Sequence, residues 1–191
     1  MIFCIVVILL SIVIDQISKY LVASYLPAIG TLPLIPDIFH FTYVENRGAA
    51  FGMLANHRWV FMVLSVLGIG AMIVWLAWEK PKSLWMRTAL SLVIGGGIGN
   101  MIDRLLLGYV IDFIDCRFID FYVFNIADSC VCVGCAMFVI GAIYEEVKNV
   151  KAKKAAGENG ESEENASGES EDGKSEDKQS GEDVIGDGGN E

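Results

Sequence analysis

Histidine is scarce in this sequence, where His40 and His57 are the only two among 191 residues. A helical zinc-protease site needs two histidines four residues apart, and these two do not have that spacing. A serine protease needs a serine paired with a histidine, and no serine here offers a convincing partnership. The sequence therefore argues against metallo- and serine protease chemistry, and we expect no metal ion and no cofactor.

Basic residues are also few. Residues 1–150 contain 9 basic and 11 acidic residues, a net charge of -2, so the other -8 of the total -10 lies in residues 151–191. No basic patch of the kind that binds nucleic acid is present, and we expect no nucleic-acid partner. From Ala155 onward the chain has almost no apolar residues, which is a composition that cannot bury a core. We predict a disordered acidic tail over residues 151–191.

Charge is nearly absent from four long runs, in a chain that is 53% hydrophobic. The runs cover residues 1–14, 59–78, 88–102 and 121–144. Such runs are typical of membrane-spanning helices, which need about 20 apolar residues each. The sequence therefore predicts an all-α membrane protein in which residues 1–150 form one four-helix domain.

The first run is too short by itself, so its helix must continue past Asp15. Asp15 and Lys19 are four residues apart and lie on one helical face, where they can pair while the lysine extends outward to the membrane surface. A cleaved signal peptide is the alternative, but no Lys or Arg precedes the run and no clear cleavage site follows it.

The lysines predict the orientation of the helices, because positive charge in short loops marks the cytoplasmic side. Lys80, Lys82 and Arg87 lie in the short connection between the second and third runs, and the other basic group, after the fourth run, is Lys148, Lys151, Lys153 and Lys154. We therefore expect both termini in the cytoplasm.

The segment between the first two runs, residues 27–58, has a different character. Phe39, Phe41 and Tyr43 alternate with polar residues, a period of two that predicts a strand at the membrane surface. Asn46 belongs to a polar, glycine-containing cluster that follows, which by itself also fits an ordinary loop. We predict a small extracytoplasmic β-rich segment between helices 1 and 2.

Two carboxylates, Asp112 and Asp128, stand beside long apolar segments. A carboxylate at membrane depth is costly and usually serves a site, and two that lie together can supply an acid and a base. The structural alternative for Asp128 is helix capping, because Asn125 precedes it by three residues in a capping-box-like pattern. Gly95 and Gly99 have the spacing that lets another helix approach closely.

With both termini inside, five separate polar clusters should meet at the outer membrane face. Their members are Asp15, Lys19, Asn46, Arg47, Asn100, Arg104, Asp112, Asn125 and Asp128. Unrelated caps and surface charges would also be found at the cytoplasmic ends, which carry mostly lysines. The pattern indicates one site near the outer face.

These residues, in this order, resemble the bacterial lipoprotein signal peptidases, the signal peptidase II family. The likeness spans nearly all of residues 1–147, and its marks are Asp15, Gln16, Lys19, Asn46, Gly48, Ala49, Ala50, Phe51, Gly97, Gly99, Asn100, Asp103, Arg104, Val110, Ile111, Asp112, Phe113, Phe124, Asn125, Ala127 and Asp128. The acidic tail is not part of the family's pattern.

The resemblance implies an aspartyl endopeptidase of the bacterial cytoplasmic membrane. It implies that Asp112 and Asp128 are the catalytic pair. The residues that it implies bind substrate or support the site are Asp15, Lys19, Asn46, Asn100, Arg104 and Asn125. The implied substrates are prolipoproteins with a diacylglyceryl-modified cysteine, cut on the amino side of that cysteine. We expect membrane lipid as a further partner, and a monomer.

The main alternative is a small proton- or ion-coupled transport subunit, in which buried carboxylates relay protons. Its carboxylates should lie at mid-membrane or on both faces, whereas the polar clusters of this chain gather at one. A membrane scaffold without activity is a further alternative, which an assay for cleavage would decide.

Overall fold

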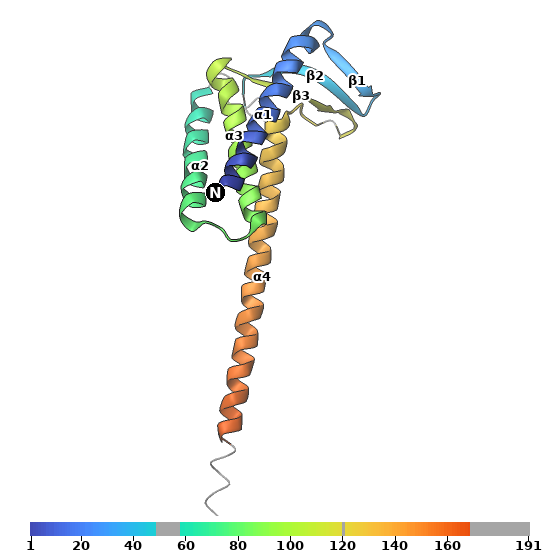
Figure 1. Ribbon diagram of the computed structural model, residues 1–191. Coiled ribbons are helices and arrows are strands. Elements are labelled where there is room, and N and C mark those ends of the chain that lie inside the picture. The colour runs from blue at the N-terminus through green and yellow to red at the C-terminus, as the bar shows by residue number, and fades with distance from the viewer. Residues whose placement is uncertain (49–57, 120, 169–191) are drawn as a thin grey trace, which may run out of the picture. The chain divides into compact units, whose positions relative to one another are not determined.

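The computed structural model describes residues 1–48, 58–119 and 121–168 of the chain (Figure 1). The helices and strands, in chain order, are α1 Ile2–Tyr25, η1 Leu26–Ala28, β1 Thr31–Ile35, β2 Phe39–Asn46, α2 Arg58–Glu79, α3 Leu84–Leu106, β3 Val110–Cys116, η3 Arg117–Ile119 and α4 Ile126–Gly168. The chain divides into two compact units, Met1–Ile143 and Tyr144–Glu191. The site and its supports all lie in the first unit.

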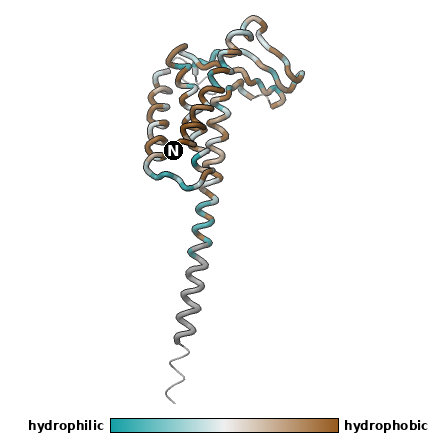
Figure 2. Tube along the Cα trace, viewed as in Figure 1, coloured by the Kyte–Doolittle hydropathy of each residue, from teal (hydrophilic) through white to brown (hydrophobic). Residues whose placement is uncertain are grey.

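Four helices of the described chain are long and apolar enough to cross a membrane, as the sequence predicts. Their candidate spans are Ile2–Ala28, Met62–Glu79, Leu84–Leu106 and Ile126–Lys151. Apolar residues dominate these helices, and the connection between α2 and α3 is polar (Figure 2). The mostly helical fold with four candidate membrane helices is therefore confirmed.

The helix boundaries differ from the predicted ones where capping residues decide them. Helix α3 begins at Leu84, before the predicted start at Thr88, because the Ser83 side chain accepts a hydrogen bond from the Met86 N–H at 3.4 Å. Helix α4 begins at Ile126, after the predicted start at Phe121. It continues to Gly168, and the boundary at residue 150 and the disorder of the tail stay predictions.

Helix α3 is the central helix of the first unit, with α1 and α2 packed against it (Figure 1). The core between them consists of Cys4, Ile69, Leu76, Leu90 and Ile94. A Cβ added at Gly95 would lie 2.7 Å from the Ser11 Cβ of α1, and one at Gly99 would lie 2.6 Å from Asp15 Oδ2. The predicted role of Gly95 and Gly99 in close helix packing is therefore confirmed.

The sheet has three antiparallel strands in the order β1-β2-β3. The sequence predicted β structure only between helices 1 and 2, and this was wrong for the third strand, because β3 follows α3. Strand β3 consists largely of β-branched and aromatic residues, which favour strands, but its partner β2 is far away in the sequence. The pairing places Asp112 opposite Val44 and Val110 opposite Asn46.

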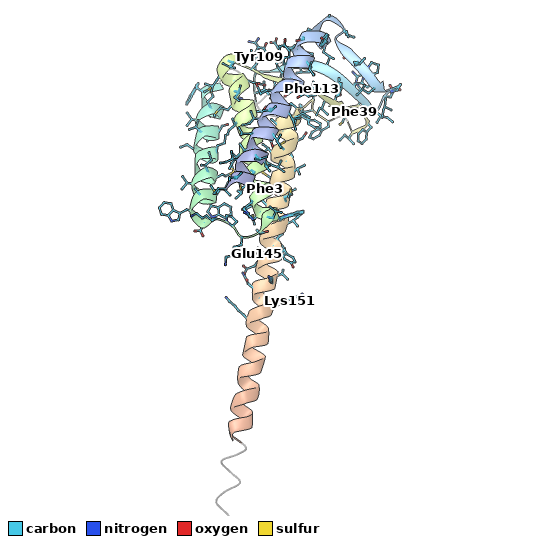
Figure 3. All side chains as sticks on the ribbon, in the orientation of Figure 1. Phe3, Phe39, Tyr109, Phe113, Glu145 and Lys151 are labelled. Atoms are coloured by element: carbon cyan, nitrogen blue, oxygen red, sulfur yellow. The ribbon has the colours of Figure 1, made fainter. Side chains whose placement is uncertain are left out.

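The sheet packs on the C-terminal end of α1. Val22 of α1 and Leu26 of η1, which follows directly, form a buried cluster with Ile111 and Phe113 of β3. The Phe113 ring also meets the Phe41 ring edge to face, with their centroids 5.7 Å apart. Phe39 and Phe113 both lie on the sheet, whereas Phe3 lies near the opposite end of α1 (Figure 3). This packing fixes β3, and with it Asp112, against the helices.

Candidate active site

Asp112 of β3 is buried, with 2% of its surface exposed. Its Oδ2 accepts a hydrogen bond from Asn46 Nδ2 at 2.9 Å, and its Oδ1 accepts one from Asn125 Nδ2 at 2.6 Å. Burial raises the pKa of Asp112 to about 6, the Asn46 and Asn125 amides oppose this rise, and the negative charge of Asp128 adds to it. Asp112 is thus a carboxyl group that titrates close to neutral pH.

Asp128 lies in the first turn of α4, where it forms a reciprocal capping box with Asn125. The Asp128 N–H donates to Asn125 Oδ1 at 2.9 Å, and the Asn125 N–H donates to Asp128 Oδ2 at 3.3 Å. The other oxygen, Asp128 Oδ1, accepts from Asn100 Nδ2 at 2.7 Å. The sequence presents helix capping and a place in the polar cluster as alternatives for Asp128. The Asp128 side chain does both, because it caps α4 and also binds Asn100.

Two asparagine amides link the two aspartates. Asn125 Nδ2 donates to Asn100 Oδ1 at 3.1 Å as well as to Asp112. Since Asn100 in turn donates to Asp128, a continuous chain of hydrogen bonds runs from Asp112 through Asn125 and Asn100 to Asp128. Asn125 is fully buried, so its orientation is fixed by these contacts.

Lys19 is buried with 2% of its surface exposed, so the expectation that it extends outward to the membrane surface is wrong. Its Nζ lies 2.8 Å from Asp15 Oδ2 and 2.9 Å from Asp103 Oδ2, and it donates to Asn100 Oδ1 at 2.9 Å. A buried ammonium is costly unless it is paired and hydrogen-bonded, and these three partners supply that compensation. The predicted pairing of Asp15 with Lys19 is confirmed.

Asp15 and Asp103 also bind backbone groups beside the two aspartates. Asp15 Oδ1 accepts from the Ala127 N–H at 2.9 Å, and Asp103 Oδ2 accepts from the Ile111 N–H at 3.2 Å. Sequence reasoning counted Asp103 among the family's marks but gave it no role of its own. A signal was present, because Asp103 stands three residues after Asn100 on the same helical face.

Gln16 is a second mark of the resemblance to which sequence reasoning gave no role of its own. Its Nε2 donates to Asp103 Oδ1 at 2.9 Å and to Asp15 Oδ2 at 3.2 Å, so it joins the two carboxylates that flank Lys19. A third hydrogen bond, at 3.2 Å, reaches the Gly99 carbonyl of α3.

Asn46 and Arg104 complete the cluster. Asn46 Oδ1 accepts from the Gly48 N–H at 3.0 Å, which turns its Nδ2 toward Asp112. Arg104 Nη1 donates to the Asn100 carbonyl at 3.2 Å, and its positive charge acts on Asp128, Asp112 and Asp103. Ala49, Ala50 and Phe51, three further marks of the resemblance, lie outside the described residues.

Within residues 1–48, 58–119 and 121–168, no group of three or more His, Cys, Asp and Glu side chains is placed to hold a metal ion. His57 lies outside these ranges. The described site thus combines two carboxyl groups linked by amides, those of Asp112 and Asp128, with the charged groups of Asp15, Lys19, Asp103 and Arg104 around them.

Four helices long and apolar enough to cross a membrane, together with two carboxyl groups linked by amides, define the class as a multi-pass membrane protein with a paired-carboxylate site. The model of the family described as signal peptidase (SPase) II matches residues 7–144. The chain belongs to the signal peptidase II family.

Curated relatives and solved structures agree with this family. The lipoprotein signal peptidases of Streptococcus pyogenes serotypes M5 (strain Manfredo) and M18 (strain MGAS8232) are each 45% identical over 138 residues, covering 72% of this chain and 91% of theirs. A bacterial membrane enzyme solved by the in meso method at 2.3 Å resolution has a TM-score of 0.72 and 32% identity, with 77% of this chain and 90% of that chain covered.

Proposed function

We propose that Asp112 and Asp128 are the catalytic pair of an intramembrane aspartyl endopeptidase. Its reaction is the removal of signal peptides from diacylglyceryl-modified prolipoproteins, with the cut on the amino side of the lipidated cysteine. The observation that carries the assignment is the hydrogen-bond chain through Asn125 and Asn100, which joins two carboxyl groups in a member of the signal peptidase II family.

The surroundings of the two aspartates favour different protonation states. Asp128 accepts from a backbone N–H at the N-terminus of α4, where the helix dipole stabilises negative charge. Among the described residues, Asp112 accepts hydrogen bonds from two neutral side-chain amides, and its burial raises its pKa to about 6. We therefore assign the proton to Asp112 and the negative charge to Asp128.

In the proposed mechanism, ionised Asp128 removes a proton from a water molecule, whose oxygen attacks the scissile carbonyl carbon. Asp112 gives its proton to the carbonyl oxygen, which forms a neutral tetrahedral diol. Asp112, now ionised, then takes a proton back from one hydroxyl of the diol as the carbonyl re-forms. The C–N bond breaks, and Asp128 gives its proton to the leaving amine. Both aspartates end in their starting states, and no covalent enzyme intermediate forms.

The other predicted site residues support this pair in the proposal. Asn46, Asn100 and Asn125 hold the carboxylates by amide hydrogen bonds. Arg104 supplies positive charge near both aspartates, which favours the negative charge that persists through the cycle. Asp15 and Lys19 lie one layer further from the pair.

The proposed location is the bacterial cytoplasmic membrane, with the site near the outer face and both termini in the cytoplasm. The basic residues Lys80 and Lys82 support this orientation, because they lie between α2 and α3, at the end of α3 opposite to the end that leads into β3. A scissile bond at the membrane surface can then reach the pair while the substrate's signal helix and acyl chains stay in the lipid. We propose that the protein works as a monomer, that residues 1–150 form the peptidase domain, and that residues 151–191 are a disordered cytoplasmic tail.

The experiment that tests this function is a cleavage assay with purified protein in lipid. A prolipoprotein carrying the diacylglyceryl group is compared with the same precursor without it, and the released signal peptide is identified by mass spectrometry. We expect cleavage on the amino side of the modified cysteine and poor cleavage of the unmodified precursor. Equal cleavage of both, or cleavage of neither, would contradict the proposal.

A further inference from the structure

The backbone just before each aspartate is held by a carboxylate from another helix. The N–H of Ile111, the residue before Asp112, donates to Asp103 Oδ2 of α3 at 3.2 Å. The N–H of Ala127, the residue before Asp128, donates to Asp15 Oδ1 of α1 at 2.9 Å. The same kind of contact therefore occurs one residue before both members of the proposed pair.

One ammonium joins these two carboxylates. Lys19 Nζ lies 2.8 Å from Asp15 and 2.9 Å from Asp103, and all three side chains are at most 4% exposed. The strand that carries Asp112 and the helix that carries Asp128 are thereby tied through a single buried cation. Lys19 also donates to Asn100 Oδ1 at 2.9 Å, which gives a further route to Asp128.

The backbone N–H of Ala127 has a particular need for this partner. The first four N–H groups of an α-helix have no acceptor within the helix, and Ala127 is the second residue of α4. Asp15 is therefore a capping carboxylate delivered from α1, placed where the helix dipole favours negative charge. A shift of Asp15 would move the start of α4 and the side chain of Asp128 with it.

We propose that Asp15, Lys19 and Asp103 form a clamp of three ions that sets the spacing of Asp112 and Asp128 by holding the backbone one residue before each. The three are positioning residues, since they act through the backbone and through Asn100. This inference rests on the proposed catalytic pair.

A buried ion group that only stabilises the fold is the competing explanation, and the chain offers a matched example of one. Asp115 is 8% exposed and lies on the same strand as Asp112. Its Oδ2 accepts from Arg117 Nε at 3.1 Å and from the Thr42 hydroxyl at 2.7 Å. Asp115→Asn therefore changes a buried, cation-paired carboxylate in the sheet but keeps the hydrogen bonds from the Ile111 and Ala127 N–H groups to Asp103 and Asp15.

The clamp also predicts an electrical effect. Burial raises the pKa of Asp112, and the Lys19 ammonium is among the groups that oppose this rise. Removing the ammonium should therefore let Asp112 keep its proton to higher pH. A substitution that only lowered the amount of folded protein would reduce activity by the same factor at every pH. The pH at which the cleavage rate falls would not change.

The test compares Lys19→Met, Asp103→Ala and Asp103→Asn with Asp115→Asn, using purified full-length protein in lipid and a lipidated prolipoprotein. The measurements are kcat and KM across pH, and amide hydrogen exchange at Ile111 and Ala127. We expect Lys19→Met and Asp103→Ala to lower kcat roughly 10- to 100-fold with little change in KM, because small misplacements of catalytic groups cost that much. Asp103→Asn keeps an acceptor oxygen and should recover part of the loss.

The exchange pattern should follow the contacts. Asp103→Ala should speed exchange mainly at Ile111, whereas Lys19→Met should speed it at both Ile111 and Ala127. Lys19→Met should also shift the high-pH limb of the rate profile upward. If Lys19→Met does not fold, the double variant Lys19→Met/Asp103→Asn, which restores the net charge of the group, takes its place. The same loss of kcat and the same faster exchange are then expected, whereas the high-pH limb should move less, because a negative charge is removed together with the positive one.

The clamp is overturned if folded Asp103→Ala keeps its kcat. It is equally overturned if Asp115→Asn reproduces both the kcat loss and the exchange change, because the effect would then be general stability. Failure of the catalytic assignment looks different: Asp112→Asn or Asp128→Asn would cleave normally, whatever the clamp variants did.

Discussion

Removal of the Asn46 amide should move the pH profile of cleavage upward. Asn46 Nδ2 donates to Asp112 Oδ2 at 2.9 Å, so it stabilises the ionised form and holds the pKa of Asp112 below the value that burial alone would give. A hydrogen bond to a charged group contributes about 1.5–3 kcal/mol, and one pKa unit corresponds to about 1.36 kcal/mol. Because Asn46 is only partly buried, we take the lower end and expect a shift of about one pH unit in Asn46→Ala.

The sign of this shift follows from the proposed role of Asp112 as the acid. Cleavage is lost as pH rises through the pKa of Asp112, which is about 6 in the free protein, because the proton that it must donate is then absent. Asn46→Ala raises that pKa, so the high-pH limb of kcat/KM should move upward even if the maximum rate falls.

The assay measures kcat/KM with a lipidated prolipoprotein over roughly pH 5 to 9. Thr42→Val is the matched control, because the Thr42 hydroxyl of β2 donates at 2.7 Å to Asp115, which is buried on the same strand as Asp112. The control should leave the limb in place. The assignment of Asp112 as the acid is refuted if the high-pH limb of kcat/KM in Asn46→Ala lies at the same pH as in the unsubstituted protein, or at a lower pH.

Three further predictions concern the rest of the chain. Reporters fused after Lys82 and after Lys154 should read cytoplasmic and one near Asp37 extracytoplasmic, because of the lysine distribution; an extracytoplasmic signal after Lys154 would exclude the four-span orientation. Truncation after Lys154 should leave cleavage nearly intact, since the tail has almost no apolar surface with which to dock, and lost activity in correctly inserted protein would refute this. A chelator should not inhibit, because no suitable set of ligands is present in the described ranges; inhibition reversed by zinc would overturn the aspartyl assignment.

Hydropathy alone was enough to predict the four helices, because a membrane span is a local property of about 20 residues. The ends of the helices needed more information. Ser83 and Asn125 decide where α3 and α4 begin, and both starts depend on side-chain hydrogen bonds that a hydropathy pattern does not contain.

Strand β3 shows where sequence reasoning failed. Val110–Cys116 has the residue types of a strand, but α2 and α3 separate it from its partner β2, and a pairing over that distance leaves no local signal. Asp112 was therefore found as a candidate while the element that positions it was missed.

Lys19 shows the same limit within the site. Its spacing from Asp15 predicted their ion pair, which forms at 2.8 Å. Its contact with Asp103 depends on how α1 packs on α3, so the sequence could not show that the lysine is buried between two carboxylates. The grouping of the polar residues was predictable as a set, whereas the individual partners were not.

The most direct test of the catalytic pair is replacement of each aspartate by asparagine. Asparagine keeps the size and most hydrogen bonds but cannot exchange a proton, so Asp112→Asn and Asp128→Asn should each lower the cleavage rate at least about a hundredfold while still inserting and binding substrate. The double variant should be little worse than either single one, because the pair works as a unit. Asp115→Asn should cost about tenfold or less. Near-normal cleavage by Asp128→Asn would mean that this residue only caps α4. Loss of activity in well-folded Asp115→Asn would mean that the catalytic pair has been assigned to the wrong carboxylate.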